Sequence, residues 1–210
     1  GTTKIEFVNI IPADNGNVWL TTVEKGIFLT QKKLDGQLKI SHFKQGSKNH
    51  FALTSNKLNF VFEDKDKSLW LGSDKGLDLI SQSKNQGFQS RNILKNSTIK
   101  CFFIQENRAW FGTEDGFLIS YDKIQKKYQK TALAKKTINS IIKAKNENVL
   151  FISTSAGELV SFDPKMMQTT STLKISDSPL HKINQDKQGL LWIEPAKKGV
   201  YMVNPKDKKN

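Results

Sequence analysis

The residue types that most often do chemistry are sparse in this sequence and do not gather into a motif. His42, His50 and His181 are far apart along the chain and lack the short spacings of metal ligands. Cys101 is the only cysteine, so no intrachain disulfide and no multi-cysteine metal site can form, and its apolar surroundings favour a small buried hydrophobe. No glycine-rich phosphate loop or Gly-x-Ser-x-Gly motif is present. We therefore expect no metal, no cofactor and no catalytic residue in this region.

Two acidic segments come closest to a functional pattern. The run from Glu63 to Lys67 alternates carboxylates as a calcium loop does, but lysines stand inside it, and the glycine and distal glutamate of such a loop are missing. It predicts a solvated hairpin turn. Glu114 and Asp115 are adjacent, whereas a glycosidase needs two carboxylates on opposite sides of its substrate. This pair gives little support to an enzymatic function.

The composition predicts a soluble globular chain with a strongly basic surface. The 210 residues are 37% hydrophobic and 25% charged, and the formal net charge is +13. Only Arg91 and Arg108 are arginines, so nearly all the positive charge is lysine. Bidentate recognition of carboxylates or phosphates usually uses arginine, whereas single lysines solvate exposed strands and turns. We therefore expect the charge to serve solubility, and we expect no nucleic-acid partner.

One sequence pattern recurs along the whole chain. Any functional residue must therefore be positioned by the repeat unit that this pattern defines. Tryptophans stand at positions 19, 70, 110 and 192, and Leu150 takes the same place in a fifth copy, so that the spacings are 51, 40, 40 and 42 residues. Each of these positions is followed six or seven residues later by a glycine: Gly26, Gly76, Gly116, Gly157 and Gly199. Five units of one design fill the chain.

Each unit has the composition of four β-strands. An apolar run such as 58–62 precedes each tryptophan strand, and the later strands become progressively more polar. A period of about 40 to 45 residues is typical of four-stranded propeller blades, whose inner strands are covered on both faces. The sequence therefore predicts an all-β fold, a β-propeller of about five four-stranded antiparallel blades in a single domain 1–210. The blades are expected at about 7–46, 57–95, 98–134, 137–176 and 179–205.

The recurring residues have structural roles in this fold. We expect Trp19, Trp70, Trp110 and Trp192 to pack between blades rather than to form platforms for sugar rings, because every blade would need such a contact. The recurring glycines are expected to form turns, since glycine adopts a positive φ without steric cost.

The repeats resemble the two-component regulator propeller repeat. Two segments match its pattern almost throughout, namely 69–77 and 109–117. The other units depart from it: Thr21 and Ser153 replace the glycine after the tryptophan strand, Leu150 replaces the tryptophan, and Glu194-Pro195 replaces Gly-Thr.

This resemblance implies a function. In that family the repeats form the periplasmic or otherwise extracytoplasmic sensor region of membrane-anchored hybrid histidine kinases, in seven-bladed rings whose ligand is often an oligosaccharide. The expected partners are a small extracytoplasmic ligand and the remaining domains of the same polypeptide, which include the kinase. On this view the chain is an open arc or a segment of a larger propeller.

The ends of the chain bear on closure. Neither the residues before Phe7 nor the polar tail 204–210 supplies the outer strand that would close a ring. An open propeller exposes apolar blade faces, so we expect self-association.

Binding is expected at the rim formed by the turns between the second and third strands, together with the loops that enter each first strand. The longest such loop contains His50 and Phe51, in an insertion of the first unit. The candidate ligand-binding residues are Lys25, His50, Phe51, Asp74, Lys75, Glu114, Asp115, Lys197 and Lys198. A non-catalytic sensor is the function that the sequence favours, and a propeller lyase or glycosidase or a protein-protein interaction scaffold remains open.

Overall fold

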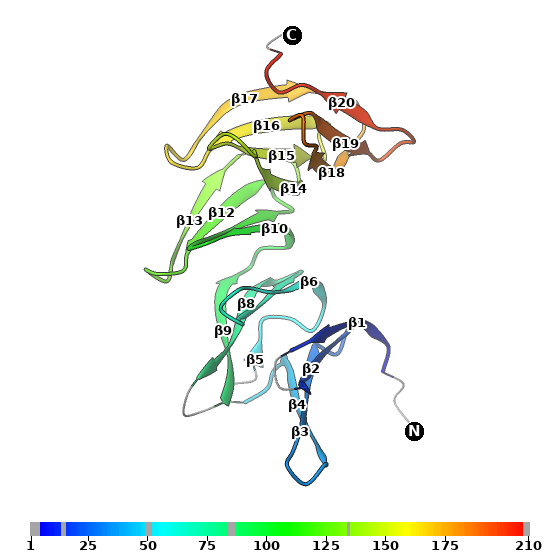
Figure 1. Ribbon diagram of the computed structural model, residues 1–210, viewed down its shortest axis with the longest axis vertical. Coiled ribbons are helices and arrows are strands. Elements are labelled where there is room, and N and C mark those ends of the chain that lie inside the picture. Colours follow the sequence, from blue (N-terminus) through cyan, green and yellow to red (C-terminus); the bar gives the residue numbers. More distant parts are fainter. Residues whose placement is uncertain (1–4, 14–15, 49–51, 84–86, 134, 208–210) are drawn as a thin grey trace. The chain divides into compact units, whose positions relative to one another are not determined.

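The computed structural model describes residues 5–13, 16–48, 52–83, 87–133 and 135–207. These residues form twenty strands and no α-helix, and therefore no helix that could cross a membrane (Figure 1). The chain divides into two compact units, Gly1–Ile99 and Lys100–Asn210. The expectation of a single domain spanning 1–210 stays a prediction.

The first unit contains two sheets. The first sheet has the order β1 (Phe7–Pro12), β2 (Val18–Thr22), β3 (Ile27–Lys32), β4 (Leu38–Gln45) and β5 (Ala52–Leu53). The second has the order β6 (Leu58–Glu63), β7 (Leu69–Ser73), β8 (Gly76–Ser83) and β9 (Gly87–Lys95). All neighbours pair antiparallel except β4 and β5, which are parallel. The fifth strand of the first sheet was not expected from the sequence.

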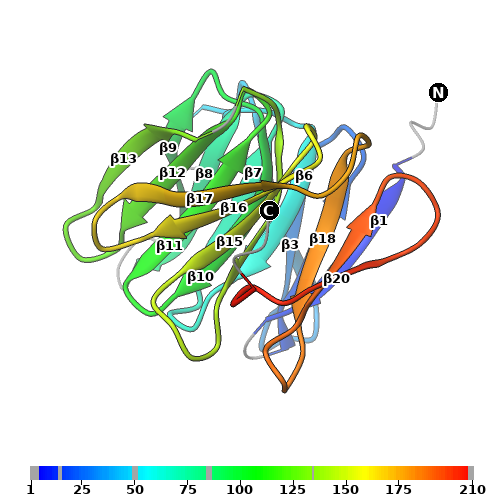
Figure 2. The same cartoon turned by 90° about the horizontal axis from the view of Figure 1, so that it is seen from above.

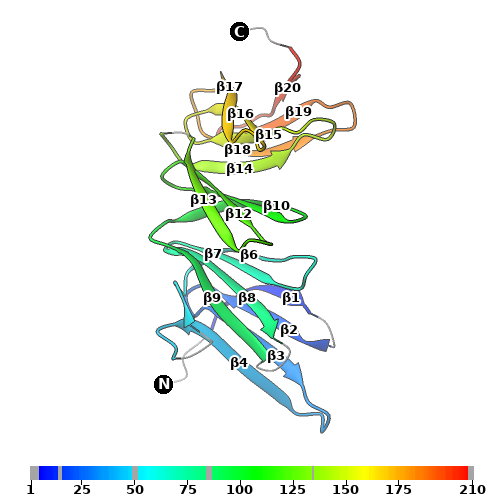
Figure 3. The ribbon, with the colours of Figure 1, turned by 90° about the vertical axis from the view of Figure 1, so that its left-hand side faces the viewer.

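The second unit contains three sheets. The third sheet of the chain has the order β10 (Ile99–Gln105), β11 (Arg108–Thr113), β12 (Phe117–Asp122) and β13 (Lys127–Ala132), which lie side by side in Figure 2. The fourth sheet has the order β14 (Ile138–Lys143), β15 (Leu150–Thr154), β16 (Glu158–Asp163) and β17 (Gln168–Lys174). The fifth sheet has only three strands, β18 (Leu180–Gln185), β19 (Leu191–Pro195) and β20 (Tyr201–Val203). Figure 3 shows these three sheets following one another.

The predicted fold class, all-β with repeated antiparallel four-stranded blades, is confirmed. Three of the five sheets have four strands, and the strands of every sheet follow each other in chain order. Each tryptophan strand is the second of its sheet, as the repeat pattern predicts. The polar tail adds no fourth strand to the last sheet within the described residues.

Sheets within a unit pack through an aromatic residue of the second strand. Trp19 is buried in one cluster with Leu71 of the following sheet. Trp110 is buried with Ile152 of the following sheet in the same way. In both places a large ring lies against aliphatic side chains of the next sheet. Trp19 and Trp110 therefore pack between consecutive sheets of their units.

The fourth sheet uses Phe151 at this position. Phe151 pairs with Ile142 of the first strand, as Trp70 pairs with Phe62, and it packs against the fifth sheet. The prediction that Leu150 replaces the tryptophan is wrong. Leu150 lies on the opposite face, in the cluster that contains Trp110. The error is one residue, and successive residues of a strand point to opposite faces.

The expected packing role is also wrong for Trp192, whose side chain is 42% exposed. Its neighbours Leu191 and Ile193 are buried against the preceding sheet, so Trp192 points the other way. The sheet of β18 to β20 is the last among the described residues, and no following sheet covers this face. Trp70, in contrast, is only 1% exposed.

The recurring glycines answer two different needs. Gly26, Gly116, Gly157 and Gly199 have positive φ values between 76° and 117°, as expected for turn residues. Gly76 is not among the positive-φ glycines, which corrects that part of the prediction. A Cβ at this position would collide with the carbonyl oxygen of Leu94, so glycine is required there by a close approach of two strands.

An aspartate closes two of the hairpins that precede a tryptophan. Asp64 accepts hydrogen bonds from the backbone N–H of Ser68 and from Nε1 of Trp70, at 3.0 Å each. Asp186 accepts them from Leu190 N at 2.9 Å and from Trp192 Nε1 at 2.8 Å. Asp64 is only 4% exposed, so the expectation of a solvated hairpin at 63–67 is wrong for this residue, although Lys65, Asp66 and Lys67 are exposed. The alternating acids include a buried structural carboxylate.

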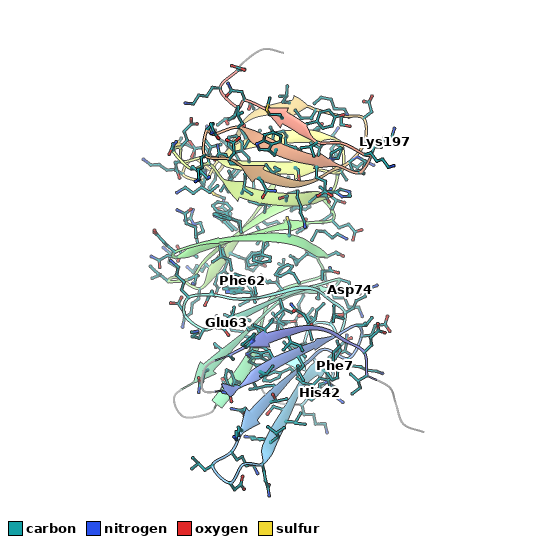
Figure 4. The ribbon with its side chains drawn as sticks, turned by 45° about the vertical axis from the view of Figure 1, so that its right-hand side comes forward. Phe7, His42, Phe62, Glu63, Asp74 and Lys197 are labelled. Carbon is teal, nitrogen blue, oxygen red and sulfur yellow. The ribbon has the colours of Figure 1, made fainter. Side chains whose placement is uncertain are left out.

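The outward face of the first sheet is apolar. Phe7 and Ile10 are 51% and 64% exposed, and Phe28 stacks on the ring of His42 with centroids 3.9 Å apart. Figure 4 shows Phe7 and His42 on this sheet. Within the first unit the second sheet covers only the opposite face, where Trp19 lies.

The contrast between Trp110 and Trp192 predicts different losses of stability. We expect Trp110→Ala to lower the free energy of unfolding by about 3 to 5 kcal/mol, because it empties a buried site. Trp192→Ala should lower it by about 1 kcal/mol, since the ring is already partly hydrated and mainly one hydrogen bond is lost. Urea unfolding followed by circular dichroism measures both values. Equal losses of stability in the two variants would contradict the view that a tryptophan stabilises the fold mainly where a following sheet covers it.

The hydrogen bond from Trp192 predicts the titration of Asp186. This bond, with those from the backbone of the turn, lowers the pKa of the Asp186 carboxyl below its usual range. The carboxylate therefore favours the folded state above the usual aspartate pKa, and this contribution is lost as pH falls through the lowered value. In Trp192→Phe the pKa should rise toward the ordinary one, as measured by carbon NMR of the carboxyl group. Met202→Leu, a change on the same face, serves as the control and should leave the titration unaltered.

Candidate functional site

The predicted rim residues of the first unit lie in turns that are hydrogen-bonded to neighbouring strands and loops. The carbonyl oxygen of Lys25 accepts a 2.6 Å hydrogen bond from Nε2 of His42. The carbonyl oxygen of Asp74 accepts one from the Thr98 hydroxyl at 2.8 Å, and that of Lys75 accepts one from the backbone of Asn96 at 2.8 Å. Oδ1 of Asp74 is buried and has no hydrogen-bond partner among the described residues. These contacts involve the backbone and leave the Lys25 and Lys75 side chains exposed.

The rim residues of the second unit are similarly divided between contact and exposure. Asp115 accepts a 2.5 Å hydrogen bond from the Thr113 hydroxyl and lies 3.8 Å from Nζ of Lys130. Glu114 is exposed, and its carbonyl oxygen accepts a hydrogen bond from Thr137. Each of these contacts shapes a turn.

Lys197 and Lys198 are exposed in the turn between β19 and β20, where Figure 4 labels Lys197. The other two predicted residues, His50 and Phe51, lie outside the described residues. Their role as ligand contacts, like that of the other rim residues, stays a prediction.

The insertion of the first unit is anchored by a buried carboxylate that the sequence analysis missed. Asp78 of β8 accepts hydrogen bonds from the backbone N–H of Thr54 at 2.8 Å and from its hydroxyl at 2.7 Å. Nδ2 of Asn92 donates a further short hydrogen bond to the same carboxylate. Burial raises the pKa of Asp78, while these hydrogen bonds oppose that shift. Asp78 therefore fixes the start of the segment that leads from β5 to β6.

One cavity of the first unit lies between its two sheets. It has a volume of about 290 Å³, and its lining combines apolar side chains with Asn9, Thr22, Lys57 and Asn59. Nδ2 of Asn59 donates to the carbonyl oxygen of Ile99 at 2.9 Å. Thr22 and Lys57 stand next to the predicted rim, although none of the predicted ligand-binding residues lines this cavity.

A second cavity lies in the second unit, at the opposite end of the sheets from the predicted rim. We call it the Arg108 cavity. Its volume is about 330 Å³, and it is lined by Gln105, Glu106, Asn107, Arg108, Trp110, Asn148, Pro164 and Lys165. These residues come from the β10–β11 hairpin, from the β14–β15 turn and from the turn between β16 and β17. Three turns from two adjacent sheets therefore build it.

The local sequence explains how Arg108 reaches this cavity. Only two residues separate β10 from β11, whereas five separate β6 from β7. Glu106 in this tight turn has a φ of 40°, in the left-handed region that two-residue hairpins use. β11 consequently begins at Arg108, which lies on the same face as Trp110 two residues later. The Arg108 guanidinium carbon is 5.7 Å from the centre of the Trp110 ring.

The groups around the Arg108 cavity are suited to binding a polar ligand. Guanidinium, ammonium and amide groups recognise oxygen atoms of a ligand, and none of the residues around the Arg108 cavity is a nucleophile paired with a base. Cys101 lies elsewhere on β10, and burial raises the pKa of its thiol to about 12, so the thiolate is scarce near neutral pH. Among the described residues, no three His, Cys, Asp or Glu side chains stand together as metal ligands.

The sequence alone does not predict the Arg108 cavity, although it contains one signal of it. Arg108 is one of only two arginines and stands two residues before a repeat tryptophan. A cation and an indole at this spacing in a strand share one face. The contributions of Asn148 and Lys165 could not be recognised, because they come from a neighbouring sheet.

Comparison with known proteins gives a likeness of fold. No family model and no curated protein matches the sequence. Over 100% of its length the chain is similar to the extracellular domain of the putative hybrid two-component system BT4673 from B. thetaiotaomicron, with a TM-score of 0.68 and 20% identity. A second structure, of the extracellular domain of the putative one-component system BT4673 from B. thetaiotaomicron, is similar over 98% of the chain, with a TM-score of 0.69 and 18% identity.

The chain is much shorter than these structures, spanning 31% of the first and 30% of the second. A structure of the mitotic checkpoint complex also aligns over 70% of the chain and 46% of its own, with a TM-score of 0.57 and 12% identity. At these identities the likeness concerns fold alone. The resemblance of the repeats to two-component regulator propellers is thus confirmed at the level of the fold, which this chain shares with the extracellular domain of a hybrid two-component system.

Proposed function

We propose that this chain is a non-catalytic, ligand-binding part of the extracytoplasmic sensor region of a membrane-anchored two-component regulator, and that its ligand is an oligosaccharide. The observation that carries the proposal is the similarity of the whole chain to the extracellular domain of a hybrid two-component system. The repeat pattern of the sequence supports it independently.

The surface chemistry is compatible with a sugar ligand. Both cavities are lined by amide, hydroxyl or cationic side chains next to apolar ones, as in the binding sites of polar small molecules. Amide and hydroxyl groups can donate to and accept from the hydroxyls of a sugar. The cavities lie at the ends of rigid hydrogen-bonded strands, which hold these groups in place.

Signal transmission sets a further requirement. A ligand can shift a regulator between two arrangements only if it binds one of them more tightly. The Arg108 cavity is built from two sheets, so a bound ligand would contact both. It would favour the distance between the two sheets at which both sets of contacts form. The partners in this proposal are the remaining domains of the same polypeptide, with a histidine kinase among them, and no nucleic acid.

Self-association belongs to the same proposal. The outward face of the first sheet exposes Phe7 and Ile10, and the last sheet exposes Trp192. Burial of apolar surface of this kind stabilises association between sheets. Lysines are distributed over the chain, so association should be favoured by salt, which screens their mutual repulsion.

Calorimetric titration with a panel of neutral and acidic oligosaccharides tests the proposed function. We expect saturable binding to at least one of them, with the ligand recovered unchanged when the mixture is analysed by mass spectrometry. Heat-unfolded protein is the control for non-specific heat. Cleavage of an oligosaccharide would contradict a non-catalytic role, and the absence of binding across the panel would contradict the oligosaccharide ligand.

A further inference from the structure

We propose that the Arg108 cavity binds a carboxylate group, and that the oligosaccharide ligand is therefore acidic, with a uronic acid as the residue that enters the cavity. This inference deepens the proposed function and rests on it for the sugar. The carboxylate site itself depends only on the geometry of the cavity.

The guanidinium of Arg108 is held in place but only partly used. Its Nη1 donates to the carbonyl oxygen of Pro164 at 3.3 Å, and its plane lies near the ring of Trp110. A guanidinium has five N–H donors, so most of them remain available. An arginine fixed on two sides loses little conformational entropy when it binds a ligand.

No carboxylate of the described residues forms an ion pair with Arg108. Asp122 stands opposite Arg108 in the pairing of β11 with β12. Its Oδ1 instead accepts the backbone N–H groups of Ile124 and Gln125, at 2.9 and 2.8 Å. Glu106 is the one carboxylate in the lining and is exposed in the turn. Arg108 and Lys165 therefore leave a net positive charge at the cavity.

The opposite wall is also prearranged. The carboxylate of Asp163 accepts the backbone N–H groups of Lys165 and Met166, at 2.7 and 3.0 Å, which fixes the turn that carries Lys165. Asn148 projects from the adjacent turn of the same sheet and adds an amide that can bind a sugar hydroxyl. A carboxylate would thus lie between a planar guanidinium on one sheet and an ammonium on the other.

Size and composition favour a sugar acid over a larger anion. The volume of about 330 Å³ is near the lower end of the range for ligand cavities, roughly 300 to 1,000 Å³. The arginine offers parallel N–H groups that match the two oxygens of a carboxylate. The cavity of the first unit has Lys57 as its only cationic lining residue and no arginine. The Arg108 cavity is therefore the better of the two for an acidic ligand.

The test compares trigalacturonate with its methyl ester, which keeps the rings and hydroxyls but removes the charges. We expect wild-type protein to bind the acid and to bind the ester at least about tenfold more weakly, as for the loss of charged hydrogen bonds. Arg108→Gln should weaken binding of the acid by a similar factor. Arg108→Lys should restore only part of it, because a single ammonium cannot form the paired contact. Arg91→Gln, which removes the other arginine, is the matched control and should bind the acid as the wild type does.

A second variant protects the test against misfolding of the first. Asn148→Asp adds a negative charge at an exposed turn without touching Arg108, and it should weaken binding of the acid by a larger factor than binding of the ester, which loses only the amide contact. Thermal unfolding by circular dichroism verifies that each variant is folded. If acid and ester bind equally well, or if neither Arg108→Gln nor Asn148→Asp alters binding of the acid, the carboxylate site is overturned while the oligosaccharide sensor stands.

The carboxylate site can also be tested when no oligosaccharide binds. In that case the proposed ligand class fails, and monomeric galacturonate is titrated while the Nε–H resonance of Arg108 is followed by nitrogen NMR. A saturable shift with galacturonate, absent with its methyl ester, supports the carboxylate site. No shift, or the same shift with both compounds, overturns it.

Discussion

The contact on which this structure depends is that of an aromatic ring on the second strand of a sheet with aliphatic side chains of the next sheet in the same unit. Trp19, Trp110 and Phe151 make this contact within the two units, each from the second strand of its sheet. A four-stranded sheet cannot bury its own faces, so burial of apolar surface between sheets supplies most of the stabilisation. Many side chains of the strands are therefore buried between sheets, and side chains that can bind a ligand lie mainly in the turns at the two ends of each sheet.

The two ends differ because of the order of the strands. Turns between second and third strands lie at one end, and turns between first and second or third and fourth strands lie at the other. At the first end, backbone groups of Asp74 and Glu114 are tied to threonines of the following loops, which closes that end with local hydrogen bonds. At the second end, the Arg108 cavity leaves cationic and amide groups available. The end that was not predicted therefore also carries side chains that can bind a ligand.

The sequence was sufficient to predict the fold, because the recurring aromatic residue is the one that packs against the next sheet. A ring followed by a glycine at a period of about 40 residues indicates stacked sheets even at low identity. It was insufficient in the fourth sheet, where a shift of one residue moves a side chain to the other face, so the sequence predicted Leu150 at the position that Phe151 occupies. The exposure of Trp192 depends on whether another sheet follows, which the residue itself does not encode. The Arg108 cavity needs three turns of two sheets, and their spacing in the sequence carries no sign of their proximity.

The length of the hairpin before the tryptophan explains why the third sheet presents a cation at this end, whereas the second and fifth sheets present a carboxylate. In the second and fifth sheets five residues form this turn, and an aspartate at its start accepts the indole N–H of Trp70 or Trp192. In the third sheet the turn has two residues and no aspartate, and the strand begins with Arg108. The shorter turn thus lacks the hydrogen-bonded carboxylate that Asp64 and Asp186 supply in the other two sheets, and it has the cation of Arg108 at the same end of the sheet. The indole that elsewhere donates to an acid here lies beside a guanidinium, and it keeps its packing contact with the next sheet.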